Sequence, residues 1–221
     1  AQGRGGKGVI GMATKEEDYI EKVLSVHSHS TCLLFTNTGR VQAMRAFQIP
    51  EAGRTAKGSN LVNLMQLEPE EKVTSMIAVN GFSDDRYLTM VTRNGVIKRT
   101  LLSDYAYQRK GGKIALALDE GDELVFVTCT GKEPVDLIIA PHNGCAVRFT
   151  VDDESVRPMG RTARGVRGIS LRDDDYVVGV TQVTEGKMLI TITENGMGKR
   201  TDFDDFRQMR HRGGFGVTCH N

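Results

Sequence analysis

A short motif recurs four times along this 221-residue chain, and it limits the possible folds more than any other feature. Each copy has an apolar stretch, a turn that ends in glycine, and a second stretch that soon becomes basic. The turn glycines are Gly39, Gly95, Gly144 and Gly196, so the steps between them are 56, 49 and 52 residues. Because Val, Ile, Leu, Phe and Thr dominate both flanks, the motif predicts a β-hairpin.

The residue before the turn glycine indicates a turn type. Three of the four turns contain Asn-Gly, at Asn94, Asn143 and Asn195. Asn-Gly accepts positive φ at both central turn positions, which a type I′ hairpin requires. We therefore expect type I′ turns.

A second marker keeps the same period. An acidic turn leads into an apolar strand at 67–73, 118–124 and 171–177, in steps of 51 and 53 residues. The marker predicts strands over Val73–Val79, Leu124–Thr130 and Val177–Val183.

Units of about fifty residues with roughly four short strands each are typical of propeller blades. No segment sustains a 3.6-residue apolar period, which excludes a helical solenoid, and the absence of Trp disfavours WD repeats. We expect one all-β domain over 1–221, with a propeller-like ring of about five blades. Its approximate repeats are 1–13 (partial), 14–66, 67–117, 118–170 and 171–221.

A third marker carries the charge. A loop rich in Gly, Arg and Lys lies between each basic strand and the next acidic turn. Net charge is only +1, yet residues 1–13, 52–67, 105–118, 155–172 and 206–221 contain no Asp or Glu. If the repeats stack around an axis, these loops fall on one rim and form a cationic stripe there.

The composition of the loops favours a polyanion. Arg offers a bidentate fork to phosphate oxygens, and glycine lets the backbone approach closely. Asn, Gln and aromatic residues are few in the loops, so we expect phosphate contacts with little reading of base edges. A curved stripe also bends the duplex that it binds. Adjacent basic residues on a strand face opposite ways, so at most half of those can reach the rim.

The residues that we expect to contact DNA lie in the glycine-rich loops and in the basic strands after the turns. They are Gln2, Arg4, Gly5, Gly6, Lys7, Gly8, Arg45, Arg54, Lys57, Lys98, Arg99, Arg109, Lys110, Lys113, Arg148, Arg161, Arg164, Arg167, Lys199, Arg200, Arg210 and Arg212. No catalytic motif and no metal-ligand spacing is found. The four cysteines form no Cys-x-x-Cys pair, which is typical of reduced thiols in a cytosolic protein.

The loop Gln2-Gly3-Arg4-Gly5-Gly6-Lys7-Gly8 resembles the gyrase A-box, a motif of the C-terminal domains of DNA gyrase A proteins. Residues 49–58 and 156–168 also resemble repeats of that family. The resemblance implies a β-pinwheel whose blades exchange strands and which wraps duplex DNA on its outer rim. Position 3 is Gly where the family usually has a basic residue, so this box lacks one charge.

The resemblance also implies partners. They are the N-terminal breakage-reunion domain of the same polypeptide and the gyrase B protein, in an A2B2 assembly in the bacterial cytoplasm. ATP and Mg²⁺ belong to other parts of that enzyme, so no cofactor is expected here. Gyrase-type members usually have six blades, whereas this chain has four hairpins and five loops, and whether the ring closes is left open. Two alternatives stay open: the matching C-terminal domain of topoisomerase IV, and a propeller that acts as a protein-interaction scaffold.

Overall fold

The computed structural model describes residues 23–53, 56–60, 63–107 and 111–218, and its strands form a series of antiparallel sheets. The first sheet has the order β3 (Val73–Val79), β1 (Thr31–Thr36), β2 (Arg40–Arg45) and β6 (Lys113–Ile114). The second is β7 (Leu124–Thr130), β4 (Tyr87–Thr92), β5 (Val96–Leu101) and β10 (Val166–Arg167). The third is β11 (Val177–Gln182), β8 (Val135–Pro141), β9 (Cys145–Val151) and β14 (Val217–Thr218). A two-stranded sheet pairs β12 (Met188–Ile192) with β13 (Gly198–Asp202).

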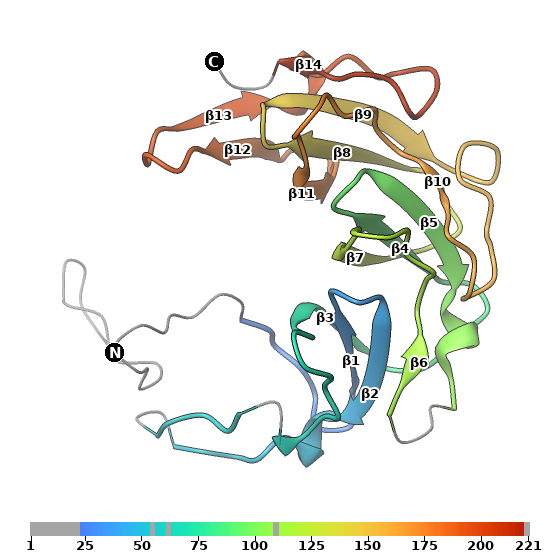
Figure 1. The fold of residues 1–221 in the computed structure, drawn as a ribbon, viewed down its shortest axis with the longest axis vertical. Coiled ribbons are helices and arrows are strands. Elements are labelled where there is room, and N and C mark those ends of the chain that lie inside the picture. The colour runs from blue at the N-terminus through green and yellow to red at the C-terminus, as the bar shows by residue number, and fades with distance from the viewer. Residues whose placement is uncertain (1–22, 54–55, 61–62, 108–110, 219–221) are drawn as a thin grey trace.

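The sheets follow one another along an arc around an open centre (Figure 1). In each four-stranded sheet, β3, β7 or β11 lies nearest the centre, and β6, β10 or β14 lies at the outer edge. In the described part of the chain, short 3-10 helices directly follow β2, β5 and β13; they are η1 (Ala46–Gln48), η3 (Leu102–Tyr105) and η4 (Phe203–Asp205). The all-β, propeller-like fold class is confirmed.

Neighbouring sheets exchange strands. Strand β6 follows the hairpin β4–β5 in the chain, yet it pairs with β2 of the preceding sheet. Strand β10 pairs with β5 and β14 with β9 in the same way. Each four-stranded sheet thus takes its outermost strand from the next repeat, so every junction between sheets is crossed by the chain at the periphery.

The hairpin turns are not type I′. Gly95 has a φ of 84°, but among the described residues positive φ outside glycine occurs only at Glu70, Tyr107 and Asp174. The turn closes with a 3.1 Å hydrogen bond from the Gly95 N–H to the Thr92 carbonyl. The Val96 N–H donates to the Thr92 hydroxyl, also at 3.1 Å. The turn is therefore the longer connection in which only the glycine is left-handed, as at a bulge, and a threonine side chain satisfies the extra amide.

The core lies between successive sheets. Phe35, Leu88 and Leu116 pack between the first and second sheets, and Ile97, Phe149 and Ile169 between the second and third. Leu116 and Ile169 come from the segments directly after β6 and β10. The exchanged segments therefore bury apolar side chains as well as add strands, which ties the outer loops to the core.

Candidate nucleic-acid interface

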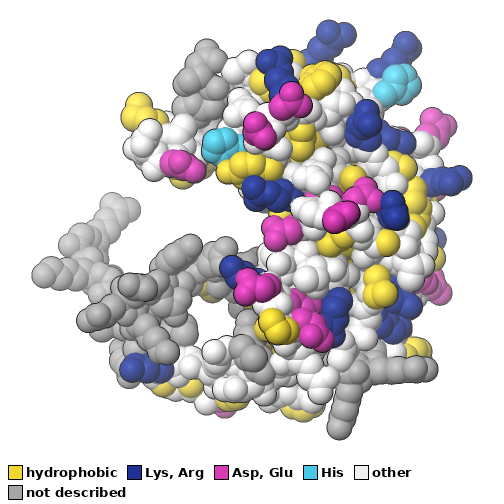
Figure 2. Space-filling model, viewed as in Figure 1, with side chains coloured by type: hydrophobic (Ala, Val, Ile, Leu, Met, Phe, Trp, Pro, Cys, Tyr) yellow, Lys and Arg dark blue, Asp and Glu magenta, His cyan; other side chains and the backbone are white. Residues whose placement is uncertain are grey.

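The basic loops lie at the outer edge of the arc. Residues 111–112, 160–165 and 210–216 lead directly into β6, β10 and β14, the outermost strands (Figure 1). Lys and Arg side chains project along the upper and right-hand margins of the same view (Figure 2). The chain folds in this way because each loop must cross from its own sheet to the preceding one.

The structure divides the residues predicted to contact DNA into four groups. Arg45, Lys57, Arg164, Arg167, Lys199, Arg200 and Arg210 are exposed. Lys113, Arg148, Arg161 and Arg212 are half-buried, and Lys98 and Arg99 are buried. The first box (Gln2, Arg4, Gly5, Gly6, Lys7 and Gly8) and Arg54, Arg109 and Lys110 lie outside the described residues.

Three further exposed arginines share the acid-free windows. Arg157, Arg172 and Arg207 are exposed, and the residue-by-residue prediction omitted them. The signal that finds them is their place within windows that contain no Asp or Glu, although Arg172 directly precedes Asp173. The acid-free windows therefore include more of the exposed arginines than the Gly-Arg-Lys motif does.

Lys98 corrects the prediction. Its side chain is fully buried, and Nζ donates to the carbonyls of Ala115 at 2.7 Å, Gly160 at 3.1 Å and Arg161 at 2.5 Å. Burial, together with the charge of Arg161, lowers the pKa of Lys98 to about 7 against a weaker opposing effect of Asp104. The ammonium fastens loop 160–161 to the segment after β6 and does not face solvent.

Arg99 is corrected for the same reason. It is 2% exposed, its guanidinium lies 4.0 Å from the Tyr87 ring centroid, and Nη1 bonds the Asp153 carboxylate at 2.9 Å. Arg148 is half-buried and bonds the Asp136 carboxylate at 3.1 Å and the Phe203 carbonyl at 2.7 Å. Both strand arginines are therefore engaged within the fold.

The loop arginines are held less tightly. Arg164 pairs with Asp119 at 2.7 Å, but the two side chains are 72% and 52% exposed. An exposed pair contributes little to stability, so phosphate can replace the carboxylate at small cost. Arg161 donates to the Ile114 carbonyl at 2.8 Å, which leaves other guanidinium N–H groups for a second acceptor.

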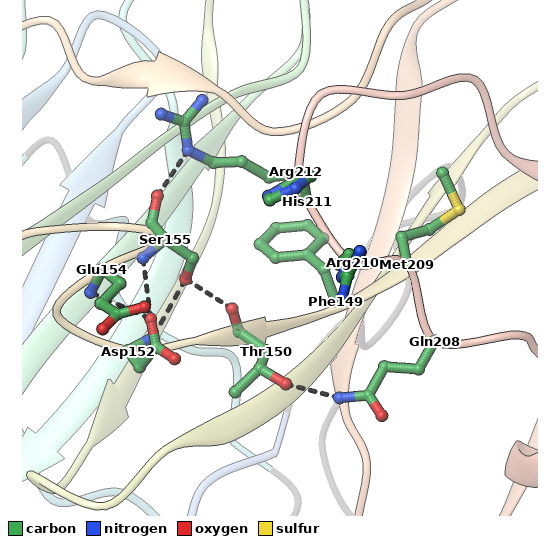
Figure 3. Close-up of a pocket in the computed structure, with 10 residues that line it drawn as sticks. All are labelled: Phe149, Thr150, Asp152, Glu154, Ser155, Gln208, Met209, Arg210, His211 and Arg212. Atoms are coloured by element: carbon green, nitrogen blue, oxygen red, sulfur yellow. Dashed lines mark hydrogen bonds between the residues drawn. The ribbon is translucent and has the colours of Figure 1, made fainter.

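A hollow next to the last basic loop is lined by residues whose hydrogen bonds connect that loop to β9 and to the turn after β9 (Figure 3). In it the Gln208 amide donates to the Thr150 hydroxyl at 2.6 Å, and Arg212 Nε donates to the Ser155 carbonyl at 2.5 Å. Its lining includes Asp152 and Glu154. The Ser155 backbone N–H, the largest of several causes, holds the pKa of Asp152 below its usual value. The lining also includes Arg210 and Arg212, so the hollow carries charges of both signs.

The acidic turns hold the hairpin turns. The Glu71 carboxylate accepts from the Thr36 and Thr38 hydroxyls at 2.7 and 2.9 Å. Asp122 accepts from the Asn94 N–H at 2.9 Å, and Asp175 from the Asn143 N–H at 3.1 Å. These periodic acids therefore have a structural role at the hairpin turns, which explains why charge is sorted with the repeat. No cluster of three or more His, Cys, Asp or Glu suited to a metal occurs in the part of the chain that the structure describes.

These features define a propeller-like repeat domain with exchanged outer strands and a basic outer edge. Residues 1–27, 30–80, 86–130, 136–184 and 187–219 match the family described as "DNA gyrase C-terminal domain, beta-propeller". The chain belongs to that family.

Two curated relatives are the DNA gyrase A proteins of Helicobacter pylori, 42% identical, and of Mycolicibacterium smegmatis, 39% identical. Each match covers 98% of this chain and 26% of the relative, so the chain spans about a quarter of their length. Among solved structures, a C-terminal domain of DNA topoisomerase IV superposes with a TM-score of 0.81 and 28% identity, over 93% of this chain and 63% of that one. A DNA gyrase A C-terminal domain gives a TM-score of 0.72 and 26% identity, over 87% and 60%.

Proposed function

We propose that the chain binds, bends and wraps duplex DNA along its outer edge without sequence specificity. The observation that carries the proposal is the placement of acid-free loops beside the outermost strands of successive sheets. Exposed Arg157, Arg164, Arg167 and Arg210 can each meet a phosphate oxygen with a charge-assisted hydrogen bond. Since the loops follow an arc, a duplex that contacts several of them must curve.

Within a longer protein, the wrapped DNA would be presented to a gyrase catalytic core that introduces negative supercoils. The partners would be the breakage-reunion domain of the same polypeptide and the gyrase B protein, in the bacterial cytoplasm. The chain itself would supply no catalytic group, and ATP and Mg²⁺ would bind to other parts of the enzyme. No helix among the described residues is long and apolar enough to cross a membrane.

Fluorescence anisotropy with two 40-base-pair duplexes of unrelated sequence tests the binding. We expect equal affinities for the two duplexes and a linear fall of log K with log salt, with a slope of about −0.9 for each phosphate neutralised. A carboxylate-rich polymer competitor at equal charge controls for non-specific attraction. Affinity that ignores salt, or no binding at low salt, would contradict the proposal.

A second candidate function is that of a topoisomerase IV C-terminal domain, because the topoisomerase IV structure gives a higher TM-score than the gyrase A structure. Ligation of nicked minicircles in the presence of the chain separates the two. A gyrase-type domain should trap strong positive wrap, whereas a topoisomerase IV-type domain should trap little. The alternative of a protein-interaction scaffold would be favoured only if neither assay detected an interaction with DNA.

A further inference from the structure

An exposed aromatic side chain lies in the last basic loop at the outer edge. Phe215 lies between Gly214 and Gly216 in the last basic loop and is 59% exposed. Exposed apolar side chains that occur singly need no explanation. The position of Phe215 within the repeat distinguishes it from such side chains.

Strand register shows that Phe215 is equivalent to Arg164. Val217 pairs with Ala146 as Val166 pairs with Ile97, and each pair is two residues beyond its own turn glycine. The Ser170 N–H donates to the Gly214 carbonyl at 2.9 Å. The Ala117 N–H donates in the same way to the Ala163 carbonyl, at 3.2 Å. The residue that follows this bonded carbonyl is Arg in one loop and Phe in the next.

The sequence extends the comparison. Lys7 and Lys57 also stand directly before the last glycine of their loops. Before β6 the equivalent residue is Gly111, because Lys113 pairs with Val41, two residues beyond Gly39. Phe215 therefore stands at a position that is cationic in three other repeats and glycine in one.

The loop presents Phe215 on a fixed backbone. The Gly213 N–H donates to the Gly168 carbonyl at 2.8 Å, and the Ser170 hydroxyl donates to the Gly213 carbonyl at 2.7 Å. On the other side, a Cβ on Gly216 would lie 2.2 Å from the Cys145 carbonyl oxygen, so the chain is pressed against β9 there. A side chain held in this way loses little freedom when it enters a partner.

The surroundings of the ring are mainly cationic. Phe215 lines a groove with Arg164, Arg167 and Asp119, and the Asp119 carboxylate pairs with Arg164 at 2.7 Å. In one repeat, Asp119 lies opposite Arg164. In the next repeat, the equivalent position opposite Phe215 holds Arg172, which is exposed. The acid-free windows 155–172 and 206–218 meet here. Such a setting attracts a polyanion rather than an acidic-rimmed apolar partner.

We propose that Phe215 acts as an apolar wedge that enters the groove of bound duplex DNA and kinks it at a base step, while the flanking arginines hold the phosphates. The inference rests on the proposed DNA-binding function. Apolar side chains that partly unstack a base step bend the duplex, and the bend brings more of it onto a curved surface. The wedge would place a sharp bend at the last basic loop, whereas the DNA on the other loops would curve gradually.

The test compares the 221-residue chain with its F215A, F215L and F215R variants. The control is I190A, which removes an apolar side chain of similar exposure, 65%, from β12. Energy transfer between dyes at the two ends of a 40-base-pair duplex reports bending. Anisotropy over a salt series reports affinity and the number of phosphates neutralised, and thermal melts confirm that each variant is folded.

We expect F215A to lose part of the bending signal and about tenfold in affinity, with an unchanged salt slope, because the loops still curve the duplex and only apolar contact is removed. F215L should keep much of the bend. F215R should steepen the slope by about one phosphate and still bend less. Bending by F215A equal to that of the parent and I190A chains would overturn the wedge alone. Failure of the parent chain to bind duplex at low salt would overturn the proposed function together with it.

Discussion

Glu71 is a carboxylate with no exposed side-chain surface, and its charge is held by several donors. Burial raises its pKa, but the Glu68 N–H, the Thr36 and Thr38 hydroxyls and the Arg40 guanidinium together lower it below 4.5. Because the folded pKa is lower than the unfolded one, the stabilisation is present above pH 4.5 and is lost as pH falls through the folded value.

We expect E71Q to lose about 2 kcal/mol of unfolding free energy at pH 7, because a charged acceptor of several hydrogen bonds becomes neutral. The difference between the parent chain and E71Q should shrink as the pH falls below 4.5. Urea unfolding at each pH measures it. The exposed neighbour Glu70 supplies the control, E70Q. A constant difference across that range would show that Glu71 acts through packing and not through charge.

Lys98 makes a separate prediction at the same scale. K98M leaves the carbonyls of Ala115, Gly160 and Arg161 without their ammonium donor, so we expect it to lower the unfolding free energy by about 2 kcal/mol. The salt slope of DNA binding should stay unchanged, since this cation does not face solvent. K132M at an exposed lysine is the control for stability. A shallower salt slope in folded K98M would restore Lys98 to the interface.

At the scale of the element, the last glycine of each loop permits strand exchange. Gly165 has a φ of 103°, and a Cβ there would lie 2.5 Å from the Ile97 carbonyl oxygen. Gly112 has a φ of 78°, and its Cβ would lie equally close to the Val41 carbonyl oxygen. These glycines let the outermost strand pass against the preceding hairpin, a role separate from any contact with phosphate.

We expect G165A to lower stability by about 2 kcal/mol or more, through backbone strain and loss of β10 pairing. Hydrogen exchange should localise the effect. The Gly168 and Ile169 amides, which donate to the Gly95 carbonyl at 2.8 and 3.2 Å, should lose protection first. G160A is the matched control, because no atom lies within 4 Å of its Cβ position. Equal protection in both variants would refute this role.

Local patterns predicted the elements well and their partners less well. The acidic turns gave β3 and β7 with the observed ends, and β11 ends at Gln182, one residue before the predicted end. The turn type was wrong, because only the glycine of each Asn-Gly pair has positive φ, both where the turn starts at Thr92 and where it starts at Pro141. The prediction that Lys98 and Arg99 contact DNA was wrong. Their burial depends on Ala115, Gly160 and Asp153, which only strand exchange brings near them. A strand pattern does not show which of its faces a later repeat will cover.

At the scale of the whole molecule, the near-zero net charge is compatible with an anion-binding surface because the two signs have different places. Glu71, Asp122 and Asp175 hold the hairpin turns, and the exposed loop arginines lie at the outer edge. Interactions between exposed charges weaken beyond about 8 Å at physiological salt. Asp119 is an exception among the turn acids, because it pairs with Arg164 at the edge at 2.7 Å, and a phosphate that binds Arg164 must displace it.

Position, rather than total charge, should then decide DNA affinity. We expect the triple variant R157Q/R164Q/R167Q to make the salt slope shallower by about 2 to 3, since each exposed arginine that meets a phosphate contributes about 0.9. The control K72Q/K132Q/K187Q removes the same charge from exposed lysines in connections that do not lead into an outermost strand. Its slope should stay near that of the parent chain. If both triple variants lose the same slope, binding follows net charge, and the outer edge is not the path of the DNA.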